Sequence, residues 1–221
     1  MPYNTDDARF WDRIARKYAA DAIKDPAGYE RTLDRTRHFL SSSDMVLEVG
    51  CGTGTTALNL APHVRRILAT DVSSEMIAIG REKAAVSACE SIEFATATTE
   101  GVPAPDNSFD AVLAFNVLHL IADRSSALRR IHRLLKPGGL FISKTPCLSE
   151  MNPLIRLAVP VMRLIGKAPH VSYFSAAGLE SELQSAAFTI IERARHGSKR
   201  KDARIFLAAR KTDPVPAAVG V

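Results

Sequence analysis

The segment Val46–Gly54, VLEVGCGTG, combines residue types that can hold a small charged ligand. A short apolar run ends in an acid, Glu48, and three glycines follow at alternate positions, Gly50, Gly52 and Gly54. Glycine tolerates a positive φ and lets a ligand lie directly against the backbone. The helix-compatible segment TTALNLA comes next, and the free N–H groups of a helix start would face that ligand. This order predicts a strand, a tight turn and a helix N-terminus around a nucleotide-type site.

The spacing of the glycines separates this loop from two common phosphate-binding loops. It lacks the Lys-Ser/Thr pair of the Walker loop, and its glycines run G-x-G-x-G rather than G-x-G-x-x-G. The loop therefore need not hold a pyrophosphate. Glu48, which precedes the first glycine, would repel a phosphate and would suit a cationic amine.

Together with later segments, VLEVGCGTG resembles the first motif of the class I S-adenosylmethionine (SAM)-dependent methyltransferases. LATDVSSEMI places an acid, Asp71, at the end of the next apolar run. PAPDNSFDAVLAFNVLHLIAD resembles the family's fourth-strand region, and LLKPGGLFIS resembles its turn into the fifth strand. FWDRIARKYA is similar to the N-terminal cap helix. The matches follow the family's order from Phe10 to Ser143, with a weaker echo to Lys211, and resemble the small-molecule branch related to quinone C-methyltransferases.

The resemblance implies that the chain binds SAM, releases S-adenosylhomocysteine (SAH) and needs no metal ion. Open α/β sheets bind ligands at the carboxyl ends of their strands, where several of these residues are expected. Glu48 would face the amino end of SAM, unless it is a carboxylate that caps the turn. Asp71 would accept both ribose hydroxyls, unless it is the N-cap of the next helix, a role that Ser73 or Ser74 could take instead. The full set predicted to contact the cofactor is Glu48, Gly50, Cys51, Gly52, Asp71, Val72, Met76, Thr98, Thr99, Asn116 and Tyr18.

Two positions around the predicted adenine carry alternatives. Met76 occupies a family position that packs on the adenine face, which suits a polarizable thioether, although core packing is the other interpretation. Thr98 aligns where relatives often carry an Asp that accepts from the adenine amino group. A hydroxyl can still accept that bond without a charge, or the backbone at Thr99 could substitute.

No side chain stands out as catalytic, because methyl transfer from a sulfonium is a direct displacement and proximity can supply much of the rate. His119, just past Asn116, is the predicted general base because the imidazole pKa suits proton transfer at neutral pH. The alternative is a structural histidine at a strand–helix junction. On the cap, Tyr18 could close over the sulfonium, whereas Trp11 is expected to pack the cap onto the body.

The segment SEMNPLIRLAVPVMRLIGKAPHVSYF carries little family signal and is expected to decide the substrate. It is amphipathic, with Arg156, Arg163 and Lys167 on one helix face and Pro160 kinking or splitting the helix. It could be a lid over a hydrophobic pocket, a core or dimer contact, or a helix on a membrane surface. The acceptor is therefore expected to be a hydrophobic or amphipathic small molecule, methylated on O, N or C. The residues predicted to contact it are His119, Met151, Ile155, His170 and Tyr173.

Composition agrees with these predictions without deciding between them. The 221 residues are 46% hydrophobic and 24% charged, as expected of a soluble globular protein. The sequence has no apolar run near the roughly 20 residues of a membrane span and no signal-peptide core. The cysteines Cys51, Cys89 and Cys147 form neither a zinc spacing nor a disulfide framework. We therefore expect a cytoplasmic protein, free or held at the inner face of a membrane, as a monomer or homodimer.

The positive charge gathers near the C-terminus. The segment Glu192–Lys211 holds eight Lys or Arg and two acids, which is +6, so the rest of the chain sums to −1. This could indicate nucleic-acid methylation, but no aromatic residue is interleaved to stack bases. FNVLHL also lacks the prolines typical of base-methylating loops. A solvated basic hairpin is the preferred interpretation, and a non-catalytic SAM-binding protein is a further alternative.

The alternation of apolar runs and helical segments predicts a doubly wound α/β fold. The near-continuous apolar runs VLAF and LFIS suit parallel strands buried on both faces, and a final hairpin would add an antiparallel last strand to a mostly parallel, seven-stranded sheet. We expect one domain over residues 1–211, with cap helices in 1–41 and a lid in 148–174, followed by a disordered tail over 212–221. The strands are expected at 45–49, 64–70, 91–97, 109–116, 140–145, 189–195 and 204–209, and the helices at 7–20, 26–40, 55–60, 74–87, 124–135 and 174–187.

Overall fold

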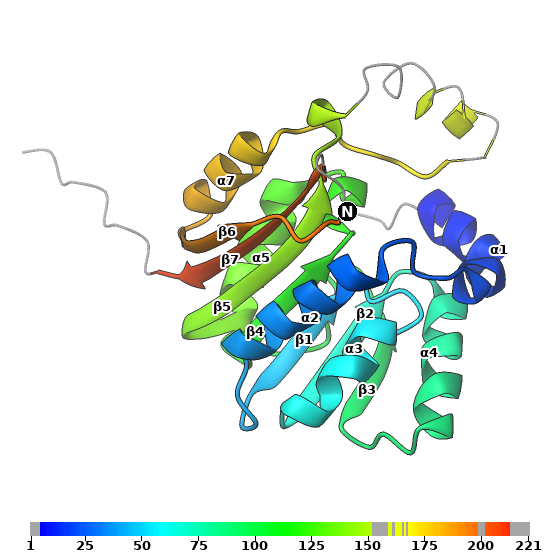
Figure 1. The fold of residues 1–221 in the computed structure, drawn as a ribbon, viewed down its shortest axis with the longest axis horizontal. Helices are drawn as coiled ribbons and strands as arrows, with labels where there is room; N and C mark the ends of the chain where they lie inside the picture. The colour runs from blue at the N-terminus through cyan, green and yellow to red at the C-terminus, as the bar shows by residue number, and fades with distance from the viewer. Residues whose placement is uncertain are drawn as a thin grey trace, which may run out of the picture.

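The computed structural model describes residues 5–151, 159–160, 162–164, 166, 168–198 and 202–212. A seven-stranded sheet runs through these residues with helices on both faces (Figure 1). The strands are β1 (Met45–Val49), β2 (Arg66–Asp71), β3 (Ile92–Thr96), β4 (Phe109–Phe115), β5 (Leu135–Pro146), β6 (Phe188–Ala194) and β7 (Arg204–Lys211). The helices are α1 (Thr5–Ala20), α2 (Pro26–Phe39), α3 (Thr55–Leu60), α4 (Ser74–Val86), α5 (Arg124–Leu134) and α7 (Ala176–Ser185), with short 3-10 helices η1 (Ala61–His63), η2 (Leu118–Leu120) and η3 (Leu148–Glu150).

The order of the strands across the sheet is β3-β2-β1-β4-β5-β7-β6. Strands β1 to β5 pair in parallel, and β7 runs antiparallel between β5 and β6. The predicted fold class is confirmed. The chain leaves β1 toward β2 on one side and later returns to β4 on the other, so the strand order reverses beside the carboxyl end of β1, where such sheets bind ligands.

The central strands are apolar on both faces because each face carries its own core. Val46 of β1 packs in one cluster with Leu33 of α2 and Leu60 of α3. Its neighbour Leu47 packs in the other cluster, with residues of α5 and α7 such as Leu128. Successive side chains of a strand point to opposite faces, so β1 is held rigidly between two helical layers. The site at its carboxyl end therefore stands on a fixed base.

Strand β5 differs from the prediction, which placed its start at Leu140 after a turn. In the structure β5 begins at Leu135. Leu135 pairs with Phe109, and the register then jumps so that Leu140 pairs with Ala111. The residues expected to form a turn are therefore a bulge inside the strand, and the Lys136 ammonium fixes it by donating to both carboxylate oxygens of Asp110 at 2.8 Å.

Helix α1 docks on α4, as the predicted cap requires. Ala15 of α1 is fully buried in a small cluster with Met76 and Ile79 of α4. The Asp12 carboxylate accepts from the Ser73 hydroxyl at 2.6 Å and from the Glu75 N–H at 3.2 Å. The cap helix is thus attached where the chain leaves β2 and enters α4.

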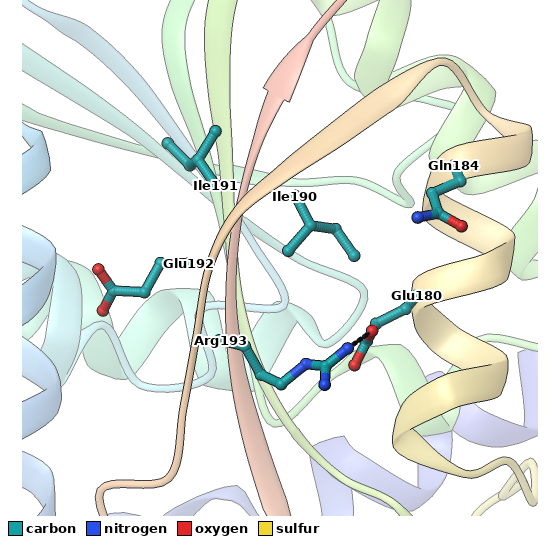
Figure 2. Close-up of a pocket in the computed structure, with 6 residues that line it drawn as sticks. All are labelled: Glu180, Gln184, Ile190, Ile191, Glu192 and Arg193. Atoms are coloured by element: carbon teal, nitrogen blue, oxygen red, sulfur yellow. Dashed lines mark hydrogen bonds and ion pairs between the residues drawn. The ribbon is translucent and has the colours of Figure 1, made fainter.

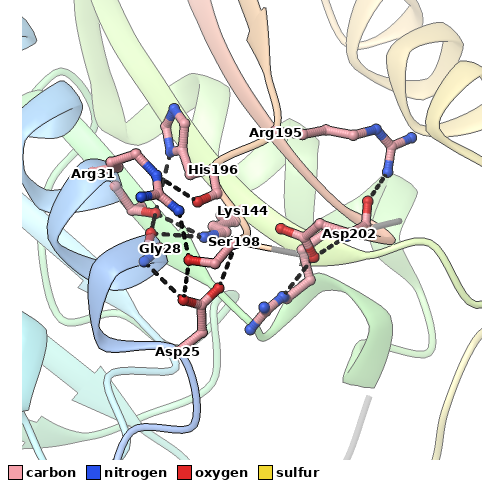
Figure 3. A network of polar contacts seen from close by, with 10 residues as sticks. Asp25, Gly28, Arg31, Lys144, Arg195, His196, Ser198 and Asp202 are labelled. Atoms are coloured by element: carbon pink, nitrogen blue, oxygen red, sulfur yellow. Dashed lines mark hydrogen bonds and ion pairs between the residues drawn. The ribbon is translucent and has the colours of Figure 1, made fainter. Parts of the chain in front are cut away.

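The turn between β6 and β7 returns to α2 through a polar network (Figure 3). The Asp25 carboxylate accepts from the N–H of Ser198 at 2.8 Å and from its hydroxyl at 2.6 Å. The buried ammonium of Lys144 on β5 donates to the Thr32 hydroxyl of α2 at 2.7 Å. The described basic residues near this hairpin also have intramolecular partners. These contacts are Arg193 with Glu180, Arg195 with Glu150, Arg204 with Asp202, Arg210 with the Gly138 carbonyl, and Lys211 with the Leu135 carbonyl.

Two sequence predictions fall partly or wholly outside the described residues. Much of the amphipathic segment, including Ile155, Arg156 and Lys167, lies outside the described residues, and so does the predicted tail from residue 213 onward. Within the described part of the chain, none of the helices has the length and apolar character needed to cross a membrane.

Two glycines on helices predict opposite effects of the same substitution. A Cβ on Gly80 of α4 would lie 2.6 Å from the Phe94 ring. Overpacking typically costs about 1–3 kcal/mol and outweighs the gain of about 1 kcal/mol in helix propensity. On Gly178 of α7 the nearest atom, Ser175 Oγ, lies at 3.4 Å. We expect Gly80→Ala to lower the free energy of unfolding in urea by about 1–2 kcal/mol and Gly178→Ala to raise it. Shifts of the same sign would contradict this packing.

Candidate functional site

The glycine turn after β1 is built from three residues with positive φ, Gly50 at 66°, Gly52 at 54° and Gly54 at 73°. A Cβ on Gly50 would overlap the Val117 side chain, and one on Gly54 would lie 2.6 Å from the Phe94 ring. Gly50 and Gly54 are therefore required by packing. A Cβ on Gly52 would meet only the Tyr18 ring, at 3.8 Å, so the backbone at Gly52 is open beneath the cap helix.

Asp71, at the carboxyl end of β2, is tied to this turn. Its Oδ2 accepts from the Gly52 N–H at 2.9 Å, and its Oδ1 accepts from the Ser73 N–H at 2.9 Å. The hydroxyl of Ser73, not the carboxylate of Asp71, caps α4 by accepting from the Met76 N–H at 3.1 Å. Because each carboxylate oxygen can accept a second hydrogen bond, Asp71 keeps acceptor capacity for a ligand.

Glu48, on β1, is 2% exposed. Its carboxylate accepts a hydrogen bond from the Ala57 N–H in the first turn of α3, so the turn-capping interpretation is partly realised. Its Oε2 atom, however, is buried and has no hydrogen-bond partner in the described part of the chain. Burial, and then the nearby negative charge of Asp71, raise the pKa of Glu48 to about 8. An orphaned buried oxygen of this kind is unusual and indicates that a donor is meant to reach it.

The pKa of the Asp71 carboxylate is raised, as that of Glu48 is. Burial raises its pKa, and the hydrogen bonds from the backbone of Ser73, Gly52 and Val72 oppose that rise. The Glu48 and Asp71 carboxylates belong to adjacent strands, since Glu48 pairs with Ala69 of β2 in the parallel register. A cation placed between them would relieve both the desolvation and the mutual repulsion.

The rest of the turn is held by backbone and by α4. The Cys51 N–H donates to the Thr70 carbonyl at 2.9 Å, while burial raises the pKa of its thiol and keeps it neutral. The Lys83 ammonium of α4 donates to the hydroxyls of Thr53 at 2.8 Å and Thr55 at 3.0 Å. Lys83 thus joins α4 to the turn and to the start of α3.

Three further residues predicted to contact the cofactor follow β3 and β4. The Thr98 hydroxyl accepts from the Gly101 N–H at 3.1 Å, and Thr99 beside it is buried. Asn116 is exposed after β4 with a φ of 55°, and its N–H donates to the Lys144 carbonyl at 2.7 Å. All three lie near the carboxyl ends of the parallel strands, where the prediction placed them, and their contacts with a cofactor stay predictions.

Two predicted cofactor contacts come from the α1–α4 side. Met76 is buried between α1 and α4, where Ala15 and Ile79 already pack it, so its contact with adenine stays a prediction. Tyr18 of α1 is half exposed above Gly52, and its ring meets the edge of the Trp11 ring at 6.2 Å. Burial, followed by the charge of Asp71, raises the pKa of Tyr18 and keeps its hydroxyl protonated.

His119 lies in η2, just past β4. Its Nδ1 is 3.2 Å from the Thr145 hydroxyl of β5. Burial lowers the pKa of His119 to about 4. The imidazole is therefore neutral at physiological pH, but it is a weaker base than the one expected from an imidazole pKa near neutrality. If Nδ1 donates to Thr145, then Nε2 is free to accept a proton; the reverse tautomer would block it. Ser143, on the same face of β5 as Thr145, has a buried hydroxyl without a partner among the described residues.

The described residues of the segment predicted as a lid connect to His119 through Ser172. The Ser172 N–H donates to the His119 carbonyl at 2.7 Å, and the Ser172 hydroxyl lies 3.1 Å from His170 Nε2. The His170 N–H in turn donates to Asp7 of α1 at 3.0 Å. Tyr173 is half-buried just after Ser172, and Met151 is 38% exposed after η3. Four of the five predicted substrate residues therefore fall among the described residues, and Ile155 lies outside them.

Two open clefts are lined by the described residues. One, of about 390 Å³, runs between α7 and the edge strand β6, where Arg193 pairs with Glu180 (Figure 2). Strands β4, β5 and β7 separate it from β1, which is about 19 Å at a strand spacing of about 4.8 Å. It is therefore remote from the glycine turn. The other, of about 400 Å³, lies between α1 and the lid residues Arg163, Leu164, Gly166 and Ala168.

Sequence reasoning missed three residues that shape the site. Asp12 anchors the cap to Ser73, Lys83 braces the turn, and Val117 fills the space beside Gly50. The first two contacts span 61 and 30 residues along the chain, so no local pattern could show them. In the described part of the chain no three His, Cys, Asp or Glu side chains gather as metal ligands would.

Comparison with known proteins identifies relatives of the central region. The methyltransferase-domain family matches residues 47–143. The uncharacterized methyltransferase YcgJ of Bacillus subtilis is 34% identical over 122 residues, which are 52% of this chain and 48% of YcgJ. The mitochondrial arginine-hydroxylase NDUFAF5 of Danio rerio is 32% identical over 176 residues, 77% of this chain and 53% of that protein. The ubiquinone/menaquinone biosynthesis C-methyltransferase UbiE of Geotalea daltonii is 38% identical over 133 residues, 58% of this chain and 50% of UbiE. The chain thus spans about half the length of these relatives.

Solved structures share the whole fold. One solved structure is the complex between the Haloferax volcanii Trm112 methyltransferase activator and the putative methyltransferase. One of its chains superposes with a TM-score of 0.77 at 16% identity, and the match covers 95% of this chain and 99% of that chain. The crystal structure of YcgJ gives a TM-score of 0.69 over 84% of this chain and 100% of YcgJ, at 19% identity. At these identities the likeness concerns the fold. The region matched by the methyltransferase-domain family contains the glycine turn between Glu48 and Asp71, so residues 47–143 resemble a methyltransferase domain, and the fold around them is the one that these solved structures share.

Proposed function

We propose that the protein transfers the methyl group of SAM to a hydrophobic or amphipathic small molecule. The observation that carries the proposal is the unpartnered Oε2 of Glu48, buried among the described residues near Asp71, whose own carboxylate accepts from the Gly52 N–H. Few ligands combine a primary ammonium with a vicinal diol on a ribose. SAM does, and the two carboxylates provide acceptors for each of those groups.

The residues present fit this cofactor. Glu48 would accept from the ammonium of the methionine end, and Asp71 would accept from the ribose hydroxyls with the acceptor capacity that Gly52 and Ser73 leave unused. The open backbone at Gly52 gives the methionine portion room to approach. Tyr18 overhangs this backbone and would exclude water from it.

When bound, SAM supplies an electrophilic methyl carbon on a sulfonium. The task of the protein is then to align the acceptor, to exclude water and to remove a proton where the acceptor carries one. His119 would perform the last of these, and its contact with the Thr145 hydroxyl supports this role if Nδ1 is the donor. An acceptor nucleophile that arrives without a proton would not need it.

The acceptor class rests on the segment around residues 148–174 and on the relatives. UbiE is named for quinone C-methylation, and quinones of this kind are hydrophobic. The exposed apolar side chains of Met151, Met162 and Leu164 provide a surface for such a molecule. The proposal therefore concerns an apolar acceptor that is methylated on carbon, nitrogen or oxygen.

A second candidate is a SAM-fold protein that does not methylate. NDUFAF5 is named as an arginine hydroxylase, and a structural neighbour with a TM-score of 0.67 is named as the [4+2]-cyclase SpnF. Turnover separates the two functions, because only a methyltransferase converts SAM to SAH in proportion to methylated acceptor. Tritium transfer from methyl-labelled SAM to a panel of quinones, phenols and amphipathic acids tests this. Binding of SAM without transfer to any of them would favour the second candidate.

Removal of the Asp71 carboxylate is expected to weaken SAM binding. Charge-assisted hydrogen bonds contribute about 1.5–3 kcal/mol, so Asp71→Asn should raise the Kd for SAM and for SAH roughly ten- to hundredfold in calorimetry. The amide matches the carboxylate in size, but its NH2 group cannot accept one of the two N–H bonds from Gly52 and Ser73, so thermal unfolding is needed to show that the turn is still folded. Asp106→Asn, on an exposed loop carboxylate, is the matched charge control. An unchanged Kd in a folded Asp71→Asn protein would contradict the ribose role.

Glu48 is expected to link pH to both stability and binding. Its pKa is raised from 4.5 to about 8 in the folded protein. Its neutral form is therefore favoured on folding, and the associated stability is lost as pH rises from about 4.5 through about 8. Glu48→Gln should remove this loss and raise the unfolding free energy of the ligand-free protein above pH 8, by on the order of 2 kcal/mol.

The same substitution should weaken SAM binding, because a neutral amide cannot balance the ammonium. In the wild type, SAM affinity should rise between pH 6 and pH 8 as Glu48 ionises, and in Glu48→Gln that rise should shrink. A variant that is less stable than wild type at pH 8.5 and binds SAM normally would show that Glu48 is a structural acid only.

His119 is expected to affect turnover more than cofactor binding. If it is the base, His119→Ala should lower kcat about 10²- to 10⁴-fold with the Kd for SAM unchanged. Because burial lowers its pKa to about 4, wild-type kcat should show no histidine titration between pH 6 and pH 8. Thr145→Val, which removes its partner while keeping its shape, should lower kcat less. Full activity of His119→Ala on an acceptor that must lose a proton would return His119 to a structural role.

A further inference from the structure

We propose that the cleft between α1 and the lid residues Arg163, Leu164, Gly166 and Ala168 binds the anionic group, a carboxylate or phosphate, of an amphipathic acceptor. This inference rests on the proposed function, since it names the chemical class of its acceptor. The cleft has a volume of about 400 Å³, enough for a head group and part of an apolar chain. Its two walls are distant in sequence, since Arg13 and Gly166 are 153 positions apart.

The charge of the cleft lining is strongly positive. Among the described residues, Arg9, Arg13 and Arg163 line it together with one carboxylate, that of Asp7. These groups leave a net charge of +2. The Asp7 carboxylate is already engaged by the His170 N–H at 3.0 Å. The electrostatic potential of the cleft is therefore positive. A carboxylate or phosphate is the ligand that a guanidinium group recognises best.

Arg13 is held in place for such a ligand. Its Nη2 donates to the Gly166 carbonyl at 2.6 Å, and its guanidinium carbon lies 5.6 Å from the centre of the Phe10 ring. That bond occupies one donor of a guanidinium group that carries several. A guanidinium fixed on a carbonyl and over a ring loses less freedom on binding an anion than a free one would.

The other part of the lining is apolar. Phe10 and Leu164 belong to the cleft, and Leu164 is 88% exposed. An exposed leucine beside arginines is matched by a ligand that carries an apolar chain next to its anionic group. Inorganic phosphate alone would leave this surface in water.

The cleft is connected to the proposed methyl-transfer region in two ways, by a series of contacts and by helix α1. The Arg163 guanidinium lies 3.2 Å from His170 Nδ1, and His170 contacts Ser172, which binds the His119 carbonyl. Along α1, Arg13 is five residues from Tyr18, which is about 7.5 Å at about 1.5 Å per residue. The acceptor should therefore carry its anion on the order of 10 Å from the atom that is methylated.

The test uses octyl phosphate, with octanol as the uncharged match and inorganic phosphate as the chain-free match. We expect calorimetry on the full chain to show octyl phosphate binding at least about tenfold more tightly than either. Arg13→Gln/Arg163→Gln should lose at least about tenfold of that affinity, and Arg129→Gln, at an exposed arginine of α5, should lose none. Equal binding of octanol, or an unchanged double variant, would overturn the proposal.

Two further measurements separate the possible failures. Arg163→Gln alone changes an exposed side chain, so it keeps the test valid if the double variant does not fold. The Kd for SAM should be the same in wild type and both variants. If wild type does not bind SAM, the proposed function fails while the anion result stands by itself; if SAM binds and octyl phosphate does not, the inference fails alone.

The anion could also be a lipid head group, and vesicle flotation distinguishes this source. We expect vesicles of phosphatidylcholine with phosphatidylglycerol to capture no more wild-type protein than phosphatidylcholine alone. Capture that depends on Arg13 and Arg163, without binding of octyl phosphate, would overturn the assignment to a soluble acceptor and place the anion on a membrane.

Discussion

The carboxylates of Glu48 and Asp71 lie on adjacent central strands almost out of contact with water, and the rest of the site is arranged around them. Burial raises the pKa of both groups, and the charge of Asp71 adds to the rise at Glu48. Such an arrangement weakens the ligand-free protein, because the two buried acids repel each other and the Oε2 atom of Glu48 lacks a hydrogen-bond partner among the described residues. The fold holds it in place by packing β1 between two helical layers, by fixing Asp71 on two N–H groups, and by bracing the glycine turn with Lys83. A cationic ligand with a diol removes the cost, which is why this constraint indicates SAM.

Helix α1 links the cofactor side of the protein to its proposed acceptor side. Near its C-terminal end Tyr18 overhangs the Gly52 backbone, and at its middle Arg13 donates to the Gly166 carbonyl. Asp12 and Ala15 attach the helix to the Ser73 cap and to α4. A change in the position of α1 would therefore alter both regions together. This coupling gives a physical reason for an N-terminal cap that belongs to the site and not only to the outer surface.

The sequence predicted the strands and helices of the body because apolar runs, glycines and capping residues mark them locally. Ser73 as the cap of α4, and Asp71 left with acceptor capacity, follow from that local chemistry. The predicted start of β5 was wrong, because the residues that look like a turn form a bulge in the strand opposite Phe109 and Ala111. Asp12 and Lys83 could not be found, since their partners lie far along the chain. The neutrality of His119 depends on burial, which a sequence pattern does not show.

A crystal structure of the protein with SAH tests the central claim most directly. We expect the SAH amino group within hydrogen-bond distance of Glu48 Oε2 and the ribose hydroxyls on the Asp71 carboxylate, with the methionine-derived portion lying on the Gly52 backbone beneath Tyr18. The Gly52 and Ser73 N–H bonds to Asp71 should persist in the complex. SAH bound elsewhere, for example in the groove beside β6, or a Glu48 Oε2 that still lacks a partner in the complex, would contradict the claim.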